Sequence, residues 1–90
     1  MNFQEYNELT KDEYLRFERI LESERLSKYR DVCGFMYLAQ IIDGAVIAGA
    51  EHDLIYFSGD PETFTEDQAI YLSRCGIHFS EKYDSLIMFT

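Results

Sequence analysis

The chain has 90 residues, 47% hydrophobic and 16% aromatic, which predicts one folded domain over residues 1–90 and excludes a disordered acidic chain. Its net charge of −9 is uneven, because residues 1–30 carry seven Asp/Glu against six Lys/Arg, whereas residues 31–90 carry ten against two. The acidic part of the chain, residues 31–90, therefore disfavours direct binding of nucleic acid and favours a cationic partner.

The first predicted element is a helix over residues 11–29. Thr10 followed by Glu13 has the spacing of a capping box. Apolar residues then recur at helical spacing, namely Tyr14, Phe17, Ile20 and Leu21. The charged residues between them are typical of a solvated helix face. Residues 1–9 receive no predicted element and are the one segment where disorder is expected.

The second predicted element is a helix over residues 31–49, with Asp31 as its N-cap. Residues 32–42 are apolar nearly all round the helix, which indicates burial on most sides. Gly44 fits either a helix end or a site of close packing. The alternative is a strand over residues 45–48 that pairs with the strand after it.

This apolar segment also has the length of a membrane span. The nineteen residues from Val32 to Ala50 hold a single charge, Asp43. A carboxylate near the centre of a span costs about 2.5–3.5 kcal/mol on insertion scales. A 90-residue chain also needs a central apolar element for its core, so we predict a buried helix and no membrane association.

Three short strands are predicted in the remainder of the chain. Residues 53–58 are rich in β-formers and end at the turn-forming run Ser58-Gly59-Asp60-Pro61. Residues 77–80 and 85–89 predict a hairpin around the polar turn 81–84. The fold class is therefore α+β, with three helices and a three-stranded antiparallel sheet.

The third predicted helix spans residues 66–75. Thr65 with Gln68 gives a second capping box, and Phe64 with Ala69 occupies the positions of a hydrophobic staple. Gly76 follows the helix as a left-handed C-cap.

Chemical motifs give little support for catalysis. The residues able to bind zinc are scattered, namely Cys33, His52, Cys75 and His78, and none has the spacing of a metal site. No glycine-rich phosphate loop, GxSxG or HExxH is present. His52 lies between Glu51 and Asp53 and could serve as an acid–base group, but a polar exit from the second helix is the stronger interpretation. We expect a non-enzymatic protein without cofactor or metal.

The cysteine spacing and the first residues predict a cytoplasmic protein. Cys33 and Cys75 lack a CxxC arrangement, and the N-terminal residues lack the basic region and apolar run of a signal peptide. Both cysteines are expected to be free thiols in apolar surroundings.

The acidic run from Asp60 to Asp67 places four carboxylates in eight residues. One interpretation is structural, because Glu66 and Asp67 complement the dipole of the third helix. The other is a negative face that docks on an Arg/Lys-rich groove, with Phe64 or Tyr83 as an aromatic anchor. On this interpretation the partner-binding residues are Glu51, Asp53, Asp60, Glu62, Phe64, Glu66, Asp67, Tyr83 and Asp84.

Several runs in the C-terminal part resemble a known group of proteins. The runs Glu51–Tyr56, Thr65–Asp67, Cys75–His78 and Tyr83–Thr90, spread over about 40 residues, are similar to the C-terminal part of small uncharacterised acidic proteins of bacteriophages and mobile elements. The resemblance implies an anti-defence role, such as that of anti-CRISPR and anti-restriction proteins, some of which imitate the charge of DNA.

Two functions therefore lead from the sequence. The first is a non-catalytic inhibitor or adaptor that binds the basic surface of a host nucleic-acid-binding protein. The alternative is a structural or assembly subunit, for example a homodimer, that self-associates through an apolar strand edge or the second helix. An enzyme built on His52 and Asp53 is the least favoured reading.

Overall fold

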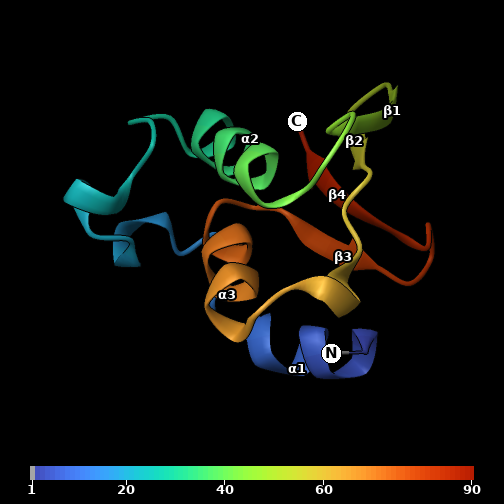
Figure 1. The fold of residues 1–90 in the computed structure, drawn as a ribbon, viewed down its shortest axis with the longest axis horizontal. Coiled ribbons are helices and arrows are strands. Elements are labelled where there is room, and N and C mark those ends of the chain that lie inside the picture. Colours follow the sequence, from blue (N-terminus) through green and yellow to red (C-terminus); the bar gives the residue numbers. More distant parts are fainter. Residues whose placement is uncertain (1) are drawn as a thin grey trace.

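The computed structural model describes residues 2–90, which form three α-helices and one antiparallel sheet (Figure 1). The α+β class is thus confirmed. In chain order the elements are α1 (Phe3–Thr10), α2 (Arg30–Ile41), β1 (Ile47–Glu51), β2 (Leu54–Phe57), α3 (Glu66–Arg74), β3 (His78–Ser80) and β4 (Ser85–Phe89). Short 3₁₀ turns lie at Phe17–Arg19, Glu22–Glu24 and Pro61–Thr63.

The sheet has four strands in the order β1-β2-β4-β3, one more than the sequence predicts. All neighbours are antiparallel, and β4 pairs with β2 on one side and with β3 on the other. The predicted hairpin of residues 77–80 and 85–89 is confirmed as β3 and β4, and the strand predicted over 53–58 is confirmed as β2.

The extra strand β1 corrects the predicted helix over residues 31–49. The helix α2 ends at Ile41, because Ile42 is extended and Gly44 has a φ of +81°, a conformation that glycine adopts freely. The chain then pairs with β2 from Ile47 onward, so the alternative of a strand near residues 45–48 is confirmed. Asp31 is not the N-cap either, since it lies in the first turn of α2 and accepts a hydrogen bond from the amide of Val32.

The predicted helix over residues 11–29 is wrong, because the first helix lies before it. Asn2 caps α1 in a reciprocal capping box with Glu5, a signal that the sequence contains at residues 2–5. Thr10 closes this helix instead of starting the next, and its hydroxyl donates to the carbonyl of Tyr6 at 2.7 Å. Leu15 has a φ of +61°, which a continuing helix does not allow.

Residues 11–25 instead follow the C-terminal half of α3. The amide of Leu15 donates to the carbonyl of Ser73 at 3.0 Å, and the hydroxyl of Ser73 donates to the carbonyl of Thr10 at 3.1 Å. Farther along, the hydroxyl of Tyr71 donates to the carbonyl of Glu24 at 2.7 Å. Backbone groups that a helix would satisfy locally are here satisfied by α3.

The helix α3 confirms the prediction for residues 66–75. Thr65 and Gln68 form the capping box, and Gly76 has a φ of +92°. The amide of Gly76 donates to Ser73 and that of Ile77 to Leu72, each at 2.9 Å, which is the Schellman pattern of a helix end.

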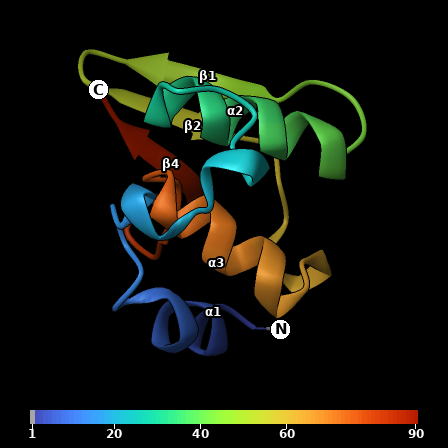
Figure 2. The same cartoon turned by 90° about the vertical axis from the view of Figure 1, so that its left-hand side faces the viewer.

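The main core lies between the sheet and the helices (Figure 2). Its fully buried members come from every helix and from the central strands, and include Tyr6, Leu38, Ala69, Leu72 and Leu86. A second, smaller cluster holds Ile20, Cys33 and Cys75 beneath the N-terminal segment. Between α2 and α3, a Cβ built on Gly34 would lie 2.7 Å from the Cβ of Cys75, so only glycine allows this approach.

The helix α2 is less buried than its composition predicts. Its buried residues are Cys33, Gly34 and Leu38, all on one side. On the other side Val32, Phe35 and Met36 are 43%, 38% and 42% exposed. None of the described helices has the length and apolarity needed to cross a membrane.

Candidate functional site

Three of the six positive charges of the N-terminal part pair with its own carboxylates. Glu13 binds two arginines at once, with Arg74 Nε at 2.6 Å and Arg19 Nη1 at 2.9 Å. The hydrogen bond from Arg74 is the main cause that holds the pKa of Glu13 below its usual range. Lys11 pairs with Glu8 at 2.7 Å on the surface of α1.

The carboxylates after residue 30 differ from Glu8 and Glu13 in their ion pairing. Within residues 2–90, and leaving Glu62 aside, none of them takes part in an ion pair. All of these side chains are exposed, namely Asp31, Asp43, Glu51, Asp53, Asp60, Glu66, Asp67, Glu81 and Asp84. Figure 1 shows the segment around residues 16–29 at the left, and the β1–β2 and β3–β4 turns at the right. The charge asymmetry of the sequence is therefore also an asymmetry in space.

Three of the predicted acidic residues line one hollow of about 390 Å³, which we call the acidic hollow. Asp60 and Glu62 come from the 3₁₀ turn after β2, and Asp84 comes from the β3–β4 turn. Asp60 Oδ1 accepts the amide of Glu62 at 3.0 Å, which fixes the turn. Asp84 has a φ of +49°, and its amide donates to the carbonyl of Glu81 at 3.3 Å. Aromatic rings of Phe3, Phe57 and Phe79 form the apolar part of the lining.

The other predicted carboxylates do not line this hollow. Glu66 and Asp67 occupy the first turn of α3, where they complement the helix dipole. Glu51 and Asp53 lie at the β1–β2 turn, at the opposite end of β2 from Asp60. The predicted residues therefore form a dispersed set of acidic turns and not one compact site.

Tyr83 is the exposed aromatic residue of this surface. Its ring contacts Tyr56 edge-on, with centroids 5.5 Å apart and planes at 74°. Burial raises the pKa of Tyr56, and the nearby carboxylate of Glu51 raises it further. Lys82 Nζ lies 5.2 Å from the centre of the Tyr83 ring. Tyr83 is therefore oriented by the sheet while 37% of its surface remains open to a partner.

The proposal of Phe64 as an anchor is wrong. Phe64 is only 5% exposed and belongs to the main core with Ala69, its partner in the hydrophobic staple. A Cβ built on Gly59 would lie 2.9 Å from the Phe64 ring, which shows how tightly the ring is enclosed. Its role is to fix the start of α3.

The histidines are in different settings. His52 is exposed in the β1–β2 turn. His78 is half-buried, its ring packs edge-on against Tyr14 at 4.8 Å, and burial lowers its pKa. Its Nδ1 is enclosed and makes no hydrogen bond among the described atoms. Across residues 2–90 there is no group of three or more His, Cys, Asp or Glu side chains able to hold a metal ion.

One chemical cluster has no signal in the sequence. Cys33 and Cys75, 42 residues apart, meet in the small core cluster, and Cys33 Sγ lies 3.2 Å from the hydroxyl of Tyr71. Tyr71 also stacks on Tyr37 at a centroid distance of 3.8 Å. Burial raises the pKa of Cys75, so its thiol stays protonated, and a protonated buried thiol is a poor nucleophile.

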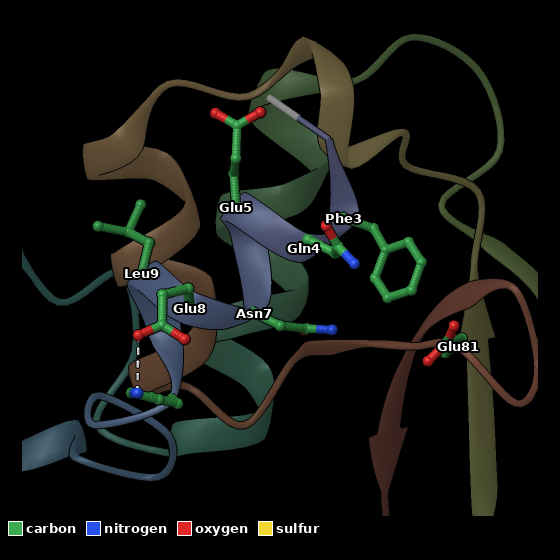
Figure 3. A pocket seen from close by; sticks show the side chains of 8 residues that line it. Phe3, Gln4, Glu5, Asn7, Glu8, Leu9 and Glu81 are labelled. Carbon is green, nitrogen blue, oxygen red and sulfur yellow. Dashed lines mark hydrogen bonds and ion pairs between the residues drawn. The ribbon is translucent and has the colours of Figure 1, made fainter.

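A larger, open hollow of about 960 Å³ lies along α1 (Figure 3). Its lining combines Phe3 and Leu9 with Glu5 and Glu8, and Glu81 faces it from the β3–β4 turn. Figure 3 shows these carboxylates on separate sides of the hollow rather than directed at one point. It extends the acidic surface without forming a catalytic constellation.

Comparison with protein-family models, with curated proteins and with solved structures finds no match for this chain.

Proposed function

We propose that the protein is a non-catalytic binding domain whose acidic turns dock on the basic surface of a nucleic-acid-binding protein. The observation that carries this proposal is the spatial division of charge. Three of the six cations in residues 1–30 pair with carboxylates of the same region, whereas nine exposed carboxylates after residue 30 have no ion-pair partner within the described chain. A partner that supplies arginine or lysine would neutralise them.

The dispersed acidic turns suit attraction at long range. The summed field of many exposed carboxylates steers a cationic partner and accelerates its association more than any single contact does. A basic groove that binds the phosphates of nucleic acid offers such a field. The resemblance to proteins of mobile elements leads us to propose a bacterial defence enzyme as the partner, inhibited in the cytoplasm by imitation of nucleic-acid charge.

The proposal is tested by matched charge variants against a protein retained from a bacterial lysate. The test variant combines Asp60→Asn, Glu62→Gln, Glu66→Gln and Asp67→Asn. The control combines Glu8→Gln, Glu18→Gln, Glu22→Gln and Glu24→Gln, which removes the same charge from the N-terminal part. We expect the test variant to slow association about tenfold at low salt with little change in dissociation, and the control to have a much smaller effect.

Two further measurements decide the mechanism. Affinity should fall steeply with added salt, since exposed charges are screened over about 8–10 Å at physiological ionic strength. Duplex DNA or RNA should compete for the same partner site. Binding that ignores salt, the test variant and competing nucleic acid would assign the acidity to solubility alone.

The alternative is a structural or assembly subunit that self-associates. The exposed apolar side of α2, with Val32, Phe35 and Met36, favours it. Sedimentation equilibrium over a hundredfold range of concentration separates the two functions. A stable dimer that dissociates on Phe35→Gln would support self-association.

A further inference from the structure

An apolar groove lies between α2 and the sheet, and we call it the α2 groove. Its volume is about 240 Å³. One wall is the start of α2, and the other is formed by β2, β4 and the residue after β4. The lining residues are Asp31, Val32, Phe35, Ile55, Phe57, Met88 and Thr90. Figure 2 shows the start of α2 beside the end of β4.

The wall from α2 continues into an exposed apolar stripe. Val32, Phe35, Met36 and Ala39 recur at helical spacing and are all exposed, while Leu38 on the other side is fully buried. A helix that is apolar all round is normally enclosed by its own protein. Here Val32, Phe35 and Met36 keep 43%, 38% and 42% of their surface open to solvent. Contiguous exposed apolar surface of this kind marks a site of interaction.

The charged residue that lines the groove is negative, and Lys28 and Arg30, which precede it in the chain, are not part of the lining. Asp31 is part of the lining. The amide of Thr90 donates to the carbonyl of Asp53 at 2.9 Å, which places the acidic β1–β2 turn next to the groove. The lining contains no Lys or Arg, and residues 32–42 of the stripe contain no charged residue at all. The site therefore combines an apolar floor with an acidic margin.

We propose that the α2 groove and the stripe receive the apolar face of a basic amphipathic helix that belongs to the partner. This inference rests on the proposed function and names the element of the partner that is bound. Large apolar residues of that helix would contact Val32, Phe35 and the half-buried Ile55, and its lysines or arginines would face Asp31 and Asp53. Recognition of an amphipathic helix in a groove is a recurrent binding mode. A second copy of the chain fits less well, because each copy brings a net charge of −9.

The length of α2 suits such a partner. Its 12 residues extend over about 18 Å, or roughly three turns, which is enough for three or four apolar anchors of a second helix. The experiment therefore uses a synthetic peptide of Leu and Lys, about 18 residues long and patterned to be an amphipathic helix. Its control has the same composition in an order without helical periodicity. Binding is measured by fluorescence anisotropy at two salt concentrations and located by backbone NMR shifts.

We expect the amphipathic peptide to bind more tightly than the control and to shift the signals of α2 and β4. Phe35→Gln should weaken its binding about tenfold, as truncation of a central anchor does. Leu21→Gln, which removes an exposed apolar residue elsewhere, should have no effect. Val32→Gln is the second test, used if circular dichroism shows that Phe35→Gln disturbs the fold.

The outcomes separate this inference from the proposed function. Equal binding of both peptides, unaffected by Phe35→Gln and Val32→Gln, overturns the α2 groove as the site but keeps the acidic docking surface. Failure of both peptides to bind even at low salt overturns both. A concentration-dependent dimer that Phe35→Gln abolishes also overturns the inference, because a second copy would then cover the stripe.

Discussion

Residues 1–30 and residues 47–90 form two regions that hold their structure in different ways. The second region consists of regular strands and one capped helix, and its carboxylates are left exposed to solvent. The first has one short helix followed by turns, and its Glu13 binds both Arg19 and Arg74 of α3. Local signals predict β2, α3 and the β3–β4 hairpin of the second region, while residues 11–25 of the first depend on contacts with residues 71–74.

This difference links stability to function. The N-terminal region uses the carboxylate of Glu13 to attach itself to Arg74 of α3, so this charge is not free to act on a partner. The C-terminal region is held together by apolar packing and by hydrogen bonds of the sheet. Its exposed carboxylates contribute little to the fold and, Glu62 aside, form no ion pair within the described chain.

The largest effect is expected in the shared core. Leu38→Ala should lower the free energy of unfolding by about 2–5 kcal/mol, because the side chain is fully buried between the sheet and the helices. Met36→Ala is the matched control from the exposed side of the same helix and should change it by less than about 1 kcal/mol. Urea unfolding measures both. Equal losses at the two positions would mean that the stripe of α2 is covered in solution.

The end of α3 is the next test, because it joins the two regions. Gly76→Val should destabilise by about 1–3 kcal/mol, since valine is strained at a φ of +92° and its Cβ would lie 2.6 Å from Arg30 Nη1. Gly44 also has a positive φ, but nothing lies near a Cβ built on it. Gly44→Ala therefore measures the backbone strain alone and should destabilise less. Gly49→Ala has neither problem and serves as the control. A thermal melt in which Gly76→Val is neutral would contradict the C-cap.

The attachment of the N-terminal region is tested by Glu13→Gln. At pH 7 we expect the free energy of unfolding to fall by about 1–2 kcal/mol, because Arg19 and Arg74 lose the charged carboxylate that accepts their hydrogen bonds. The pKa of Glu13 is lowered in the folded protein, so its contribution is present above the ordinary Glu pKa of about 4.3 and disappears as the pH falls further. The difference between the two proteins should therefore shrink between pH 5 and about pH 3. Glu18→Gln, at an exposed pair of 3.9 Å, should show no such trend.

The variant expected to weaken binding most should have the smallest effect on stability. The fourfold variant at residues 60, 62, 66 and 67 should change the free energy of unfolding by less than about 1 kcal/mol, since these carboxylates are exposed and asparagine preserves the cap at residue 60. Chemical denaturation checks this directly. A large loss would show that the acidic turns are structural, and the contrast between the two regions would then fail.

The sequence predicts those elements whose signals are local. Thr65, Gln68 and Gly76 define α3 from its own residues, and the hairpin of β3 and β4 follows from alternation around a polar turn. The helix over 11–29 fails because the hydrogen bonds that replace it come from Ser73 and Tyr71. No periodicity within the segment encodes partners about sixty residues away.

The same rule applies to the candidate site. Composition was enough to predict exposed carboxylates, but their grouping depends on the register of the sheet, which brings Asp60 and Asp84 to one hollow. The proximity of Cys33 to Cys75 and the exposure of one side of α2 also depend on tertiary structure and have no local signal in the sequence. Phe64 was misassigned as an anchor although its staple position beside Ala69 already implied burial.

The central place of β4 in the sheet has a consequence for synthesis of the chain. The strands β2 and β3 both pair with β4 and not with each other, so the four-stranded sheet cannot form before residues 85–89 are available. A ribosome releases the N-terminal residues first. Until β4 emerges, β2 can pair only with β1, and the apolar face of α3 lacks the residues of β4 that cover it. Pairings of such sequence separation form slowly, which exposes nascent chains to aggregation. Shielding of the nascent chain by a chaperone would therefore matter most between the emergence of α2 and that of β4.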